Sequence, residues 1–247
     1  MLYRTTLTPA VFLRREKRYS VLCRLLSGEE VWAHCANPGR LLSCLTEPGT
    51  PVYLLFHEPD GKKERKTSWS LEQSEPIPGV RVGLMPIRGN ALFEEALGMG
   101  FFPGFSNYPE LRREVPYGEG SRVDFVLSGP EGQIFVEVKS VTYRDGDAAL
   151  FPDAVSQRAS RHALELSRVR REGIRSAMVF VVMRSDCRYV MPASGIDPSY
   201  ARVFASVCKE GVEAHSFSVT ATESGLFPGR STPVFPEGIP AETERSQ

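Results

Sequence analysis

Short apolar runs separated by turn residues dominate the first third of the chain. They fall at residues 12–13, 19–26, 31–34 and 52–56 and around Trp69, with a basic run between the first two. Runs of this length bounded by glycine, proline and asparagine predict β-strands, and Asp60 followed by Gly61 predicts a hairpin turn. Four or five short strands within about 75 residues favour a small barrel of the OB-fold type. We therefore expect an OB-fold-like nucleic-acid-binding domain over residues 1–83.

The apolar positions that follow alternate between helical and strand periods. An apolar face over residues 92–97 predicts a helix capped by Asn90, and a stripe over residues 155–169 predicts a second helix capped by Asp153. The unbroken apolar run 177–183 predicts a strand buried on both faces. Further strands are expected at 188–191 and 212–219, with a helix at 198–208 between them. This mixture predicts an α/β domain over residues 84–227. Residues 228–247, with prolines among serine, threonine and glutamate, are expected to be disordered.

One stretch, residues 121–142, combines a strand pattern with unusual polar positions. Apolar-rich runs at 123–127 and 134–138 flank residues 129–132, a glycine and proline cluster that predicts a β-hairpin with a four-residue turn. In that register Asp124 lies opposite Glu137, and Lys139 shares the face of Glu137. Two carboxylates across a ladder repel each other, and a divalent cation between them offsets the repulsion. The alternative is a solvated strand face on which these charges form ordinary ion pairs.

Composition narrows the class of protein. The 247 residues are 41% hydrophobic and 24% charged with a formal net charge of zero, so any contact with nucleic acid must come from local basic patches. No apolar run is long enough to cross a bilayer, and the N-terminus lacks the apolar core of a signal peptide. Five cysteines without a C-x-x-C pair indicate reduced thiols. We expect a cytoplasmic protein with no membrane partner.

Basic residues and aromatic residues interleave in the first domain. Tyr19, Trp32, Tyr53 and Trp69 alternate with lysine and arginine, as a surface that stacks bases requires, although a small barrel also needs an aromatic core. His162, on the apolar edge of the second predicted helix, is expected to be a packed histidine rather than a ligand. The residues expected to contact nucleic acid are polar or basic and come from both domains: Arg14, Arg15, Asn37, Arg40, Arg122, Arg158 and Arg161.

Six longer motifs in the chain resemble those of a known protein family. In chain order they are HCANPGRL, NALFEEAL, SRVDFVL, FVEVKSVT, ALFPDAVSQRASRH and IDPSYA. The chain resembles the SfsA family (sugar fermentation stimulation protein A) over nearly all of residues 1–222, and its second half resembles the core of PD-(D/E)xK nucleases. The resemblance implies an OB-like domain, a nuclease-like α/β domain, DNA binding and a regulatory role in sugar utilisation. The chain departs from the family at Ala159 and Arg161, where a glycine and a lysine are expected.

The resemblance also implies roles for single residues. Asp124 and Glu137 would hold Mg²⁺ or Mn²⁺ together with the carbonyl of Val138, and Lys139 would orient the attacking water or stabilise developing charge. Either Glu94 or Glu95 would supply a helix acid, with Glu95 favoured. Gln157 would be an auxiliary catalytic residue from the next helix.

Two functions remain open on the sequence. The first is a DNA-binding, metal-dependent nuclease that hydrolyses phosphodiester bonds. The second is a non-catalytic DNA-binding transcriptional regulator built on a nuclease-like fold. A scaffold protein without nucleic acid is a third reading that the zero net charge allows. DNA is the expected partner, and strandedness, sequence specificity and oligomeric state are left open.

Overall fold

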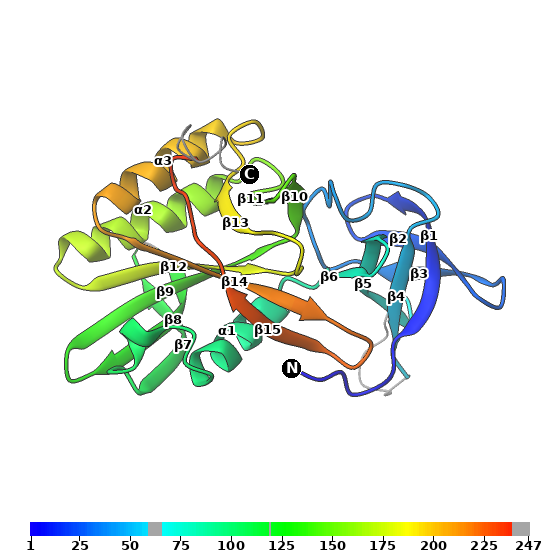
Figure 1. Cartoon of the computed structure of the whole chain (residues 1–247), viewed down its shortest axis with the longest axis horizontal. Helices are drawn as coiled ribbons and strands as arrows, with labels where there is room; N and C mark the ends of the chain where they lie inside the picture. The colour runs from blue at the N-terminus through cyan, green and yellow to red at the C-terminus, as the bar shows by residue number, and fades with distance from the viewer. Residues whose placement is uncertain (59–65, 119, 239–247) are drawn as a thin grey trace.

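The chain folds into a small barrel and a larger layered domain. The computed structural model describes residues 1–58, 66–118 and 120–238, so the predicted turn at Asp60 and Gly61 lies outside the described residues. Figure 1 shows the barrel, built from the N-terminal third, beside the layered domain. In the part of the chain that the structure describes, no helix is long and apolar enough to cross a membrane.

The barrel closes through its third and fifth strands. β1 pairs antiparallel with β2 and β4, β2 pairs with β3, β4 pairs with β5, and a parallel contact between β3 and β5 completes the ring. This is the predicted OB-like arrangement of five strands, and the prediction is confirmed. A sixth strand continues from β5 toward the second domain. The strands are β1 (Thr8–Glu16), β2 (Ser20–Leu25), β3 (Glu30–His34), β4 (Pro51–Phe56), β5 (Trp69–Ile77) and β6 (Val80–Gly83).

The barrel strands form because their apolar residues recur at every second position. In β3, Val31 and Ala33 point into the barrel, while Trp32 and His34 lie on its outer face. The aromatic residues differ in exposure. Tyr19 and Trp32 are exposed, whereas Trp69 is partly buried against the barrel core.

All five cysteines are free thiols.

The second domain is a six-stranded mixed sheet with helices on both faces (Figure 1). The order is β15-β14-β12-β9-β8-β7, in which β9, β12 and β14 are parallel. The helix α1 packs on one face, and α2 and α3 pack on the other. The elements are α1 (Arg88–Gly98), a 3-10 turn at Pro103–Phe105, β7 (Glu110–Tyr117), β8 (Ser121–Gly129), β9 (Gly132–Val141), α2 (Gln157–Arg171), β12 (Arg175–Val182), α3 (Pro198–Lys209), β14 (Glu213–Ala221) and β15 (Leu226–Ser231). A small side sheet contains β10 (Tyr143–Asp145), β11 (Ala148–Phe151) and β13 (Tyr189–Pro192).

The central strand β12 is buried on both faces, as its apolar run predicts. Val179 and Val181 pack toward α1, while Met178 and Phe180 pack toward α2 and α3. A strand between two parallel neighbours and two helical layers has no solvated face, which explains the absence of polar alternation.

The β8–β9 hairpin has the predicted register and turn. Phe125 lies opposite Val136, and the pairing continues to Gly129 opposite Gly132. The two residues between these glycines, Pro130 and Glu131, are the centre of the predicted four-residue turn at residues 129–132, and the prediction is confirmed.

Two predicted helix caps are wrong. The helix α1 begins at Arg88, two residues before Asn90, and its N-cap residue Ile87 provides no side-chain hydrogen bond. A Cβ on Gly89 would lie 2.4 Å from the Ser140 hydroxyl oxygen, so glycine lets the start of α1 approach β9 closely. The helix α2 is capped by Ser156, whose hydroxyl accepts a hydrogen bond from the Ala159 amide.

The C-terminal segment is more ordered than its composition predicts. Residues 226–231 form the edge strand β15 against β14, and the Val190 amide donates to the carbonyl of Pro233. Disorder from Pro228 onward is thus wrong for residues 228–238. Residues 239–247 lie outside the described residues.

Buried polar contacts fix the barrel against the second domain. Glu72 of β5, only 1% exposed, accepts two hydrogen bonds from Arg88 of α1, at 2.8 and 2.9 Å. Arg184, which is fully buried, donates to the Ser43 hydroxyl and to the Thr142 carbonyl, each at 3.1 Å. These contacts join the two domains through groups that are shielded from water.

Candidate active site

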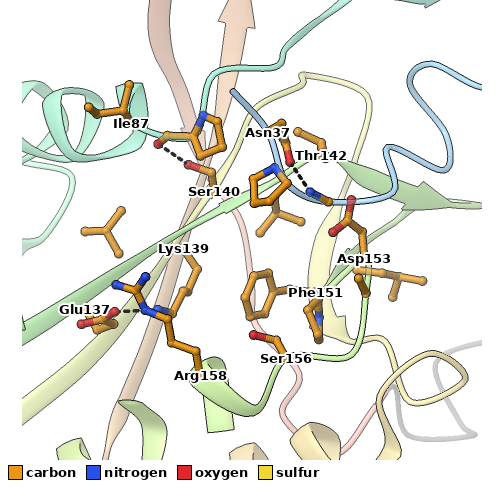
Figure 2. A pocket seen from close by; sticks show the side chains of 18 of the residues that line it. Asn37, Ile87, Glu137, Lys139, Ser140, Thr142, Phe151, Asp153, Ser156 and Arg158 are labelled. Carbon is orange, nitrogen blue, oxygen red and sulfur yellow. Dashed lines mark hydrogen bonds and ion pairs between the residues drawn. The ribbon is translucent and has the colours of Figure 1, made fainter. Parts of the chain in front are cut away.

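A cavity of about 800 Å³ opens between the barrel and the sheet of the second domain (Figure 2). The barrel contributes Arg18 and the turn at residues 37–39. The second domain contributes the start of α1, the middle of the β8–β9 hairpin, and the segment that leads into α2. The second domain's lining residues whose side chains can bind a ligand or transfer a proton are Asn90, Asp124, Glu137, Lys139, Ser140, Asp153 and Arg158.

A hydrogen bond within the turn at residues 37–39 stabilises the barrel wall of the cavity. The Asn37 side-chain oxygen accepts a hydrogen bond from the Gly39 amide at 2.9 Å. Gly39 does not adopt a positive φ, so its backbone conformation is not what requires a glycine there. A glycine is needed because the backbone at Gly39 lies close to Asp153: a Cβ there would be 2.3 Å from a carboxylate oxygen of Asp153. Asp153, predicted as a helix cap, accepts from the Leu41 amide at 3.0 Å and so joins the two domains.

Asp124 is held in place by two donors from different elements. One carboxylate oxygen accepts from the backbone amide of Val138 at 2.8 Å, and the other accepts from the Asn90 side chain at 3.2 Å. The hairpin and the first turns of α1 thus both orient this acid. The close approach of α1 at Gly89 makes the second contact reachable.

Glu137 is almost fully buried beside two nitrogen groups. Its side chain forms an ion pair with the Lys139 ammonium and a short contact with the His162 ring, both at the same oxygen Oε1. The second oxygen, Oε2, is buried without a hydrogen-bond partner among the described residues. A carboxylate oxygen in this state loses the hydration it had in water and favours a further ligand.

The pKa values of Asp124 and Glu137 are shifted in opposite directions. Burial, and then the charge on Glu137, raises the pKa of Asp124 above its ordinary value. Burial also acts to raise the pKa of Glu137, but the Lys139 ammonium and the His162 contact outweigh it, and the pKa is lowered. Glu137 is therefore the more strongly ionised of the pair.

Helix α2 adds a cation to the cavity wall. Arg158, in its first turn, lines the cavity, and Figure 2 shows its side chain rising from the helix. Its Nε group donates to the ring nitrogen Nε2 of His162 at 3.3 Å. With Lys139 and Arg18, the cavity holds three basic side chains beside its acids.

Comparison with known proteins places this fold and cavity in a family. Residues 13–82 match the model described as the SfsA N-terminal OB domain, and residues 87–225 match the one described as the Sugar fermentation stimulation protein RE domain. The chain belongs to the SfsA family. The homolog of Ruegeria pomeroyi is 42% identical over 215 residues, covering 86% of this chain and 92% of the relative. That of Thioalkalivibrio sulfidiphilus is 40% identical over 231 residues, covering 93% of both.

A solved structure of an SfsA protein supports the same architecture. The SfsA of Pyrococcus furiosus, described in complex with Ca²⁺, has a TM-score of 0.82 and 27% identity, covering 95% of this chain and 98% of that one. The predicted order of an OB-like barrel followed by an α/β domain is confirmed.

Several residues named from the sequence lie away from this SfsA cavity. Glu95 pairs with the amino group of Met1, Glu94 pairs with Arg113, and neither lines the cavity. Gln157 is exposed at the first position of α2 and is not part of the lining. Four of the arginines predicted to contact nucleic acid are exposed but do not line the cavity: Arg14, Arg40, Arg122 and Arg161.

Arg15 is engaged within the barrel itself. Its guanidinium donates to the backbone carbonyls of Arg18, Asn37 and Gly39. It therefore supports the turn that forms one wall of the cavity. The side chain that reaches the cavity from this region is that of Arg18.

Sequence reasoning missed three side chains that the fold brings to the site. Asn90 was interpreted as a helix cap, and Arg18 was not singled out. His162 is packed as predicted, at 3% exposed, but its contact with Glu137 was not foreseen. The position of His162 four residues after Arg158 on one helix face is a signal that could have linked them. The contact between Asn90 and Asp124 depends on the approach of α1 to β9, which no local pattern encodes.

Proposed function

We propose that this protein is a divalent-metal-dependent phosphodiester hydrolase that acts on DNA. The observation that carries the proposal is that Asp124, Glu137 and Lys139 converge in one cavity, where a buried oxygen of Glu137 has no partner within the described chain. Two acids and a lysine are the set that the PD-(D/E)xK resemblance implies for such chemistry.

The donor set fits a hard cation. Asp124 and Glu137 supply carboxylate oxygens, and the Val138 carbonyl is the proposed third ligand. Over the described ranges, no three His, Cys, Asp or Glu side chains form a metal-binding cluster. Two carboxylates suffice for Mg²⁺ or Mn²⁺, because such ions retain water and bind substrate phosphate as well. The Ca²⁺ in the Pyrococcus relative is a cation of the same oxygen-seeking class. When bound, the ion would polarise the phosphate and acidify a water molecule.

The chain's own residues perform the remaining tasks. The Val138 amide and Asn90 fix the direction of Asp124. Lys139 balances the charge of Glu137 and lies where it can donate to an attacking water or to a phosphate oxygen. Arg158 from α2 and Arg18 from the barrel both line the cavity and provide positive charge for the DNA backbone near the cleaved bond.

The test is cleavage of fluorescently labelled single-stranded and double-stranded DNA in the presence of Mn²⁺ or Mg²⁺. We expect wild-type cleavage that EDTA abolishes and that Asp124→Asn and Lys139→Met reduce at least about 100-fold, the scale of losing one electrostatic stabiliser. Asp153→Asn is the matched control, since this carboxylate lines the same cavity outside the proposed centre. Equal activity in Asp124→Asn and wild type would contradict the proposal.

A second candidate is metal-free DNA binding by a regulator, as the family name's link to sugar fermentation suggests. The observation that favours it is that the Lys139 ammonium balances the charge of Glu137, and His162 contacts the same oxygen, without a metal ion. Under this alternative, DNA affinity falls steeply with salt, does not depend on metal, and accompanies no cleavage.

A further inference from the structure

His162 bridges an acid of the proposed centre and a cavity arginine. It lies on α2, is 3% exposed, and its two ring nitrogens contact different partners. Nδ1 contacts Oε1 of Glu137, and Nε2 lies 3.3 Å from Nε of Arg158. Arg158 and His162 are four residues apart, so the helix itself holds them on one face.

The chemistry of the two partners assigns the proton on the ring. A guanidinium can only donate, so Nε2 of His162 must accept from Arg158 with a free lone pair. An ionised carboxylate can only accept, so Nδ1 must carry the hydrogen and donate it to Glu137. Both contacts are satisfied together by a neutral imidazole with its hydrogen on Nδ1.

The bridge leaves one face of Arg158 available. Its Nε group is used by His162, while its terminal Nη groups have no hydrogen-bond partner in the described part of the chain. The side chain is exposed and lines the cavity. The two terminal N–H groups of an exposed guanidinium suit a pair of phosphate oxygens.

We propose that His162 is a positioning residue with two separable tasks. Through Nδ1 it orients Glu137 so that the unpartnered oxygen faces the cation, and through Nε2 it holds Arg158 so that its terminal nitrogens face a DNA phosphate. This inference rests on the proposed function, since it assigns roles at the same site. It adds a residue between the metal ligand and the phosphate clamp.

Two substitutions separate the tasks. In His162→Asn the side-chain amide can replace Nδ1 and donate to Glu137, but it does not reach Arg158. In His162→Gln the longer side chain can place its amide oxygen near Nε2 and accept from Arg158, but it loses the donor to Glu137. Ca²⁺ affinity is measured by calorimetry, and the affinity for a labelled 20-nucleotide DNA is measured by fluorescence anisotropy with EDTA.

Each substitution is expected to weaken one of the two affinities and to leave the other unchanged. Loss of a group that orients a metal ligand weakens metal affinity about 10- to 100-fold, so His162→Gln should lose Ca²⁺ affinity and keep DNA affinity. His162→Asn should keep Ca²⁺ affinity and lose as much DNA affinity as Arg158→Ala does. The double variant His162→Asn with Arg158→Ala should bind DNA no more weakly than Arg158→Ala, because the two share one interaction.

The opposite results are equally clear. If both variants lose both affinities by the same factor, or neither changes, His162 only packs the core and the inference fails. Nitrogen NMR of the wild-type imidazole provides a test without substitution: a hydrogen on Nε2 would contradict the bridge. All these readouts are binding or spectroscopic. Absence of cleavage by the wild type would therefore defeat the hydrolase proposal while leaving the role of His162 measurable.

Discussion

The carboxylate of Asp124 accepts a hydrogen bond from the backbone amide of Val138 at 2.8 Å. The bond crosses from β8 to β9 one residue beyond Glu137, so it ties the direction of one acid to the strand that carries the other. An acid fixed in this way loses little freedom when it binds a ligand, which is the value of a preorganised site. The two carboxylates thus belong to one rigid unit, the β8–β9 hairpin.

Opposite pH dependence is expected for the stability contributions of the two acids. The pKa of Asp124 is raised by burial and by Glu137, so its contribution is full below the ordinary aspartate pKa and is lost as pH rises through the raised value. The pKa of Glu137 is lowered overall, so its contribution is present above the ordinary glutamate pKa and is lost as pH falls through the lowered value.

Thermal unfolding in EDTA tests this difference in sign. At pH 7.5, Asp124→Asn should stabilise the protein by about 1 kcal/mol, the scale at which function is exchanged for stability. Glu137→Gln should destabilise it by about 1–3 kcal/mol, because a buried hydrogen-bonded acceptor is altered. The gain in Asp124→Asn should disappear near pH 4. A stabilising Glu137→Gln at pH 7.5 would show that the assignment of the two shifts is reversed.

Salt dependence distinguishes Arg18 from Arg15. Arg18 lines the cavity, so Arg18→Ala should remove one phosphate contact and reduce the slope of log affinity for DNA against log salt by about 0.7–0.9. Arg15 donates to three backbone carbonyls, so Arg15→Ala should lower the melting temperature and leave the slope unchanged. If Arg15→Ala reduces the slope as Arg18→Ala does, Arg15 contacts DNA as the sequence predicts.

The pair formed by Glu72 and Arg88 should dominate the stability of the contact between domains. Arg88→Met leaves a carboxylate that is 1% exposed without its partner, which costs about 3–5 kcal/mol. Chemical denaturation measures the loss. The double variant Glu72→Leu with Arg88→Met should recover most of it, since no buried charge remains. Arg14→Ala, which breaks an exposed pair with Glu16, is the control and should cost less than about 1 kcal/mol. A small effect of Arg88→Met alone would mean that water reaches Glu72.

The sequence predicts the fold well where local period and burial agree. The run 177–183 becomes β12 because a strand buried on both faces needs apolar residues at every position. The register of the β8–β9 hairpin follows from its symmetry about residues 129–132. The edge strand β15 was missed because Pro228 and the prolines that follow the strand resemble those of disordered tails, while its pairing with β14 is set by tertiary contact.

The sequence predicts only those site residues that lie on one hairpin. Asp124, Glu137 and Lys139 lie on adjacent strands, so spacing alone places them close together. Glu95 was favoured from its place on a helix, but the helix turns it toward Met1 and presents Asn90 to the cavity instead. Which face of α1 meets β9 depends on Gly89 and Ser140, a contact between distant segments.

The most direct test of the proposed centre is calorimetric titration of Mn²⁺ into wild type, Asp124→Asn, and the control Asp153→Asn. The account predicts one site in wild type and in the control, and affinity in Asp124→Asn that is at least about 10-fold weaker, as expected when one of few ligands is neutralised. Equal affinity in all three proteins, or no binding in any of them with DNA also present, would contradict a metal centre at Asp124 and Glu137.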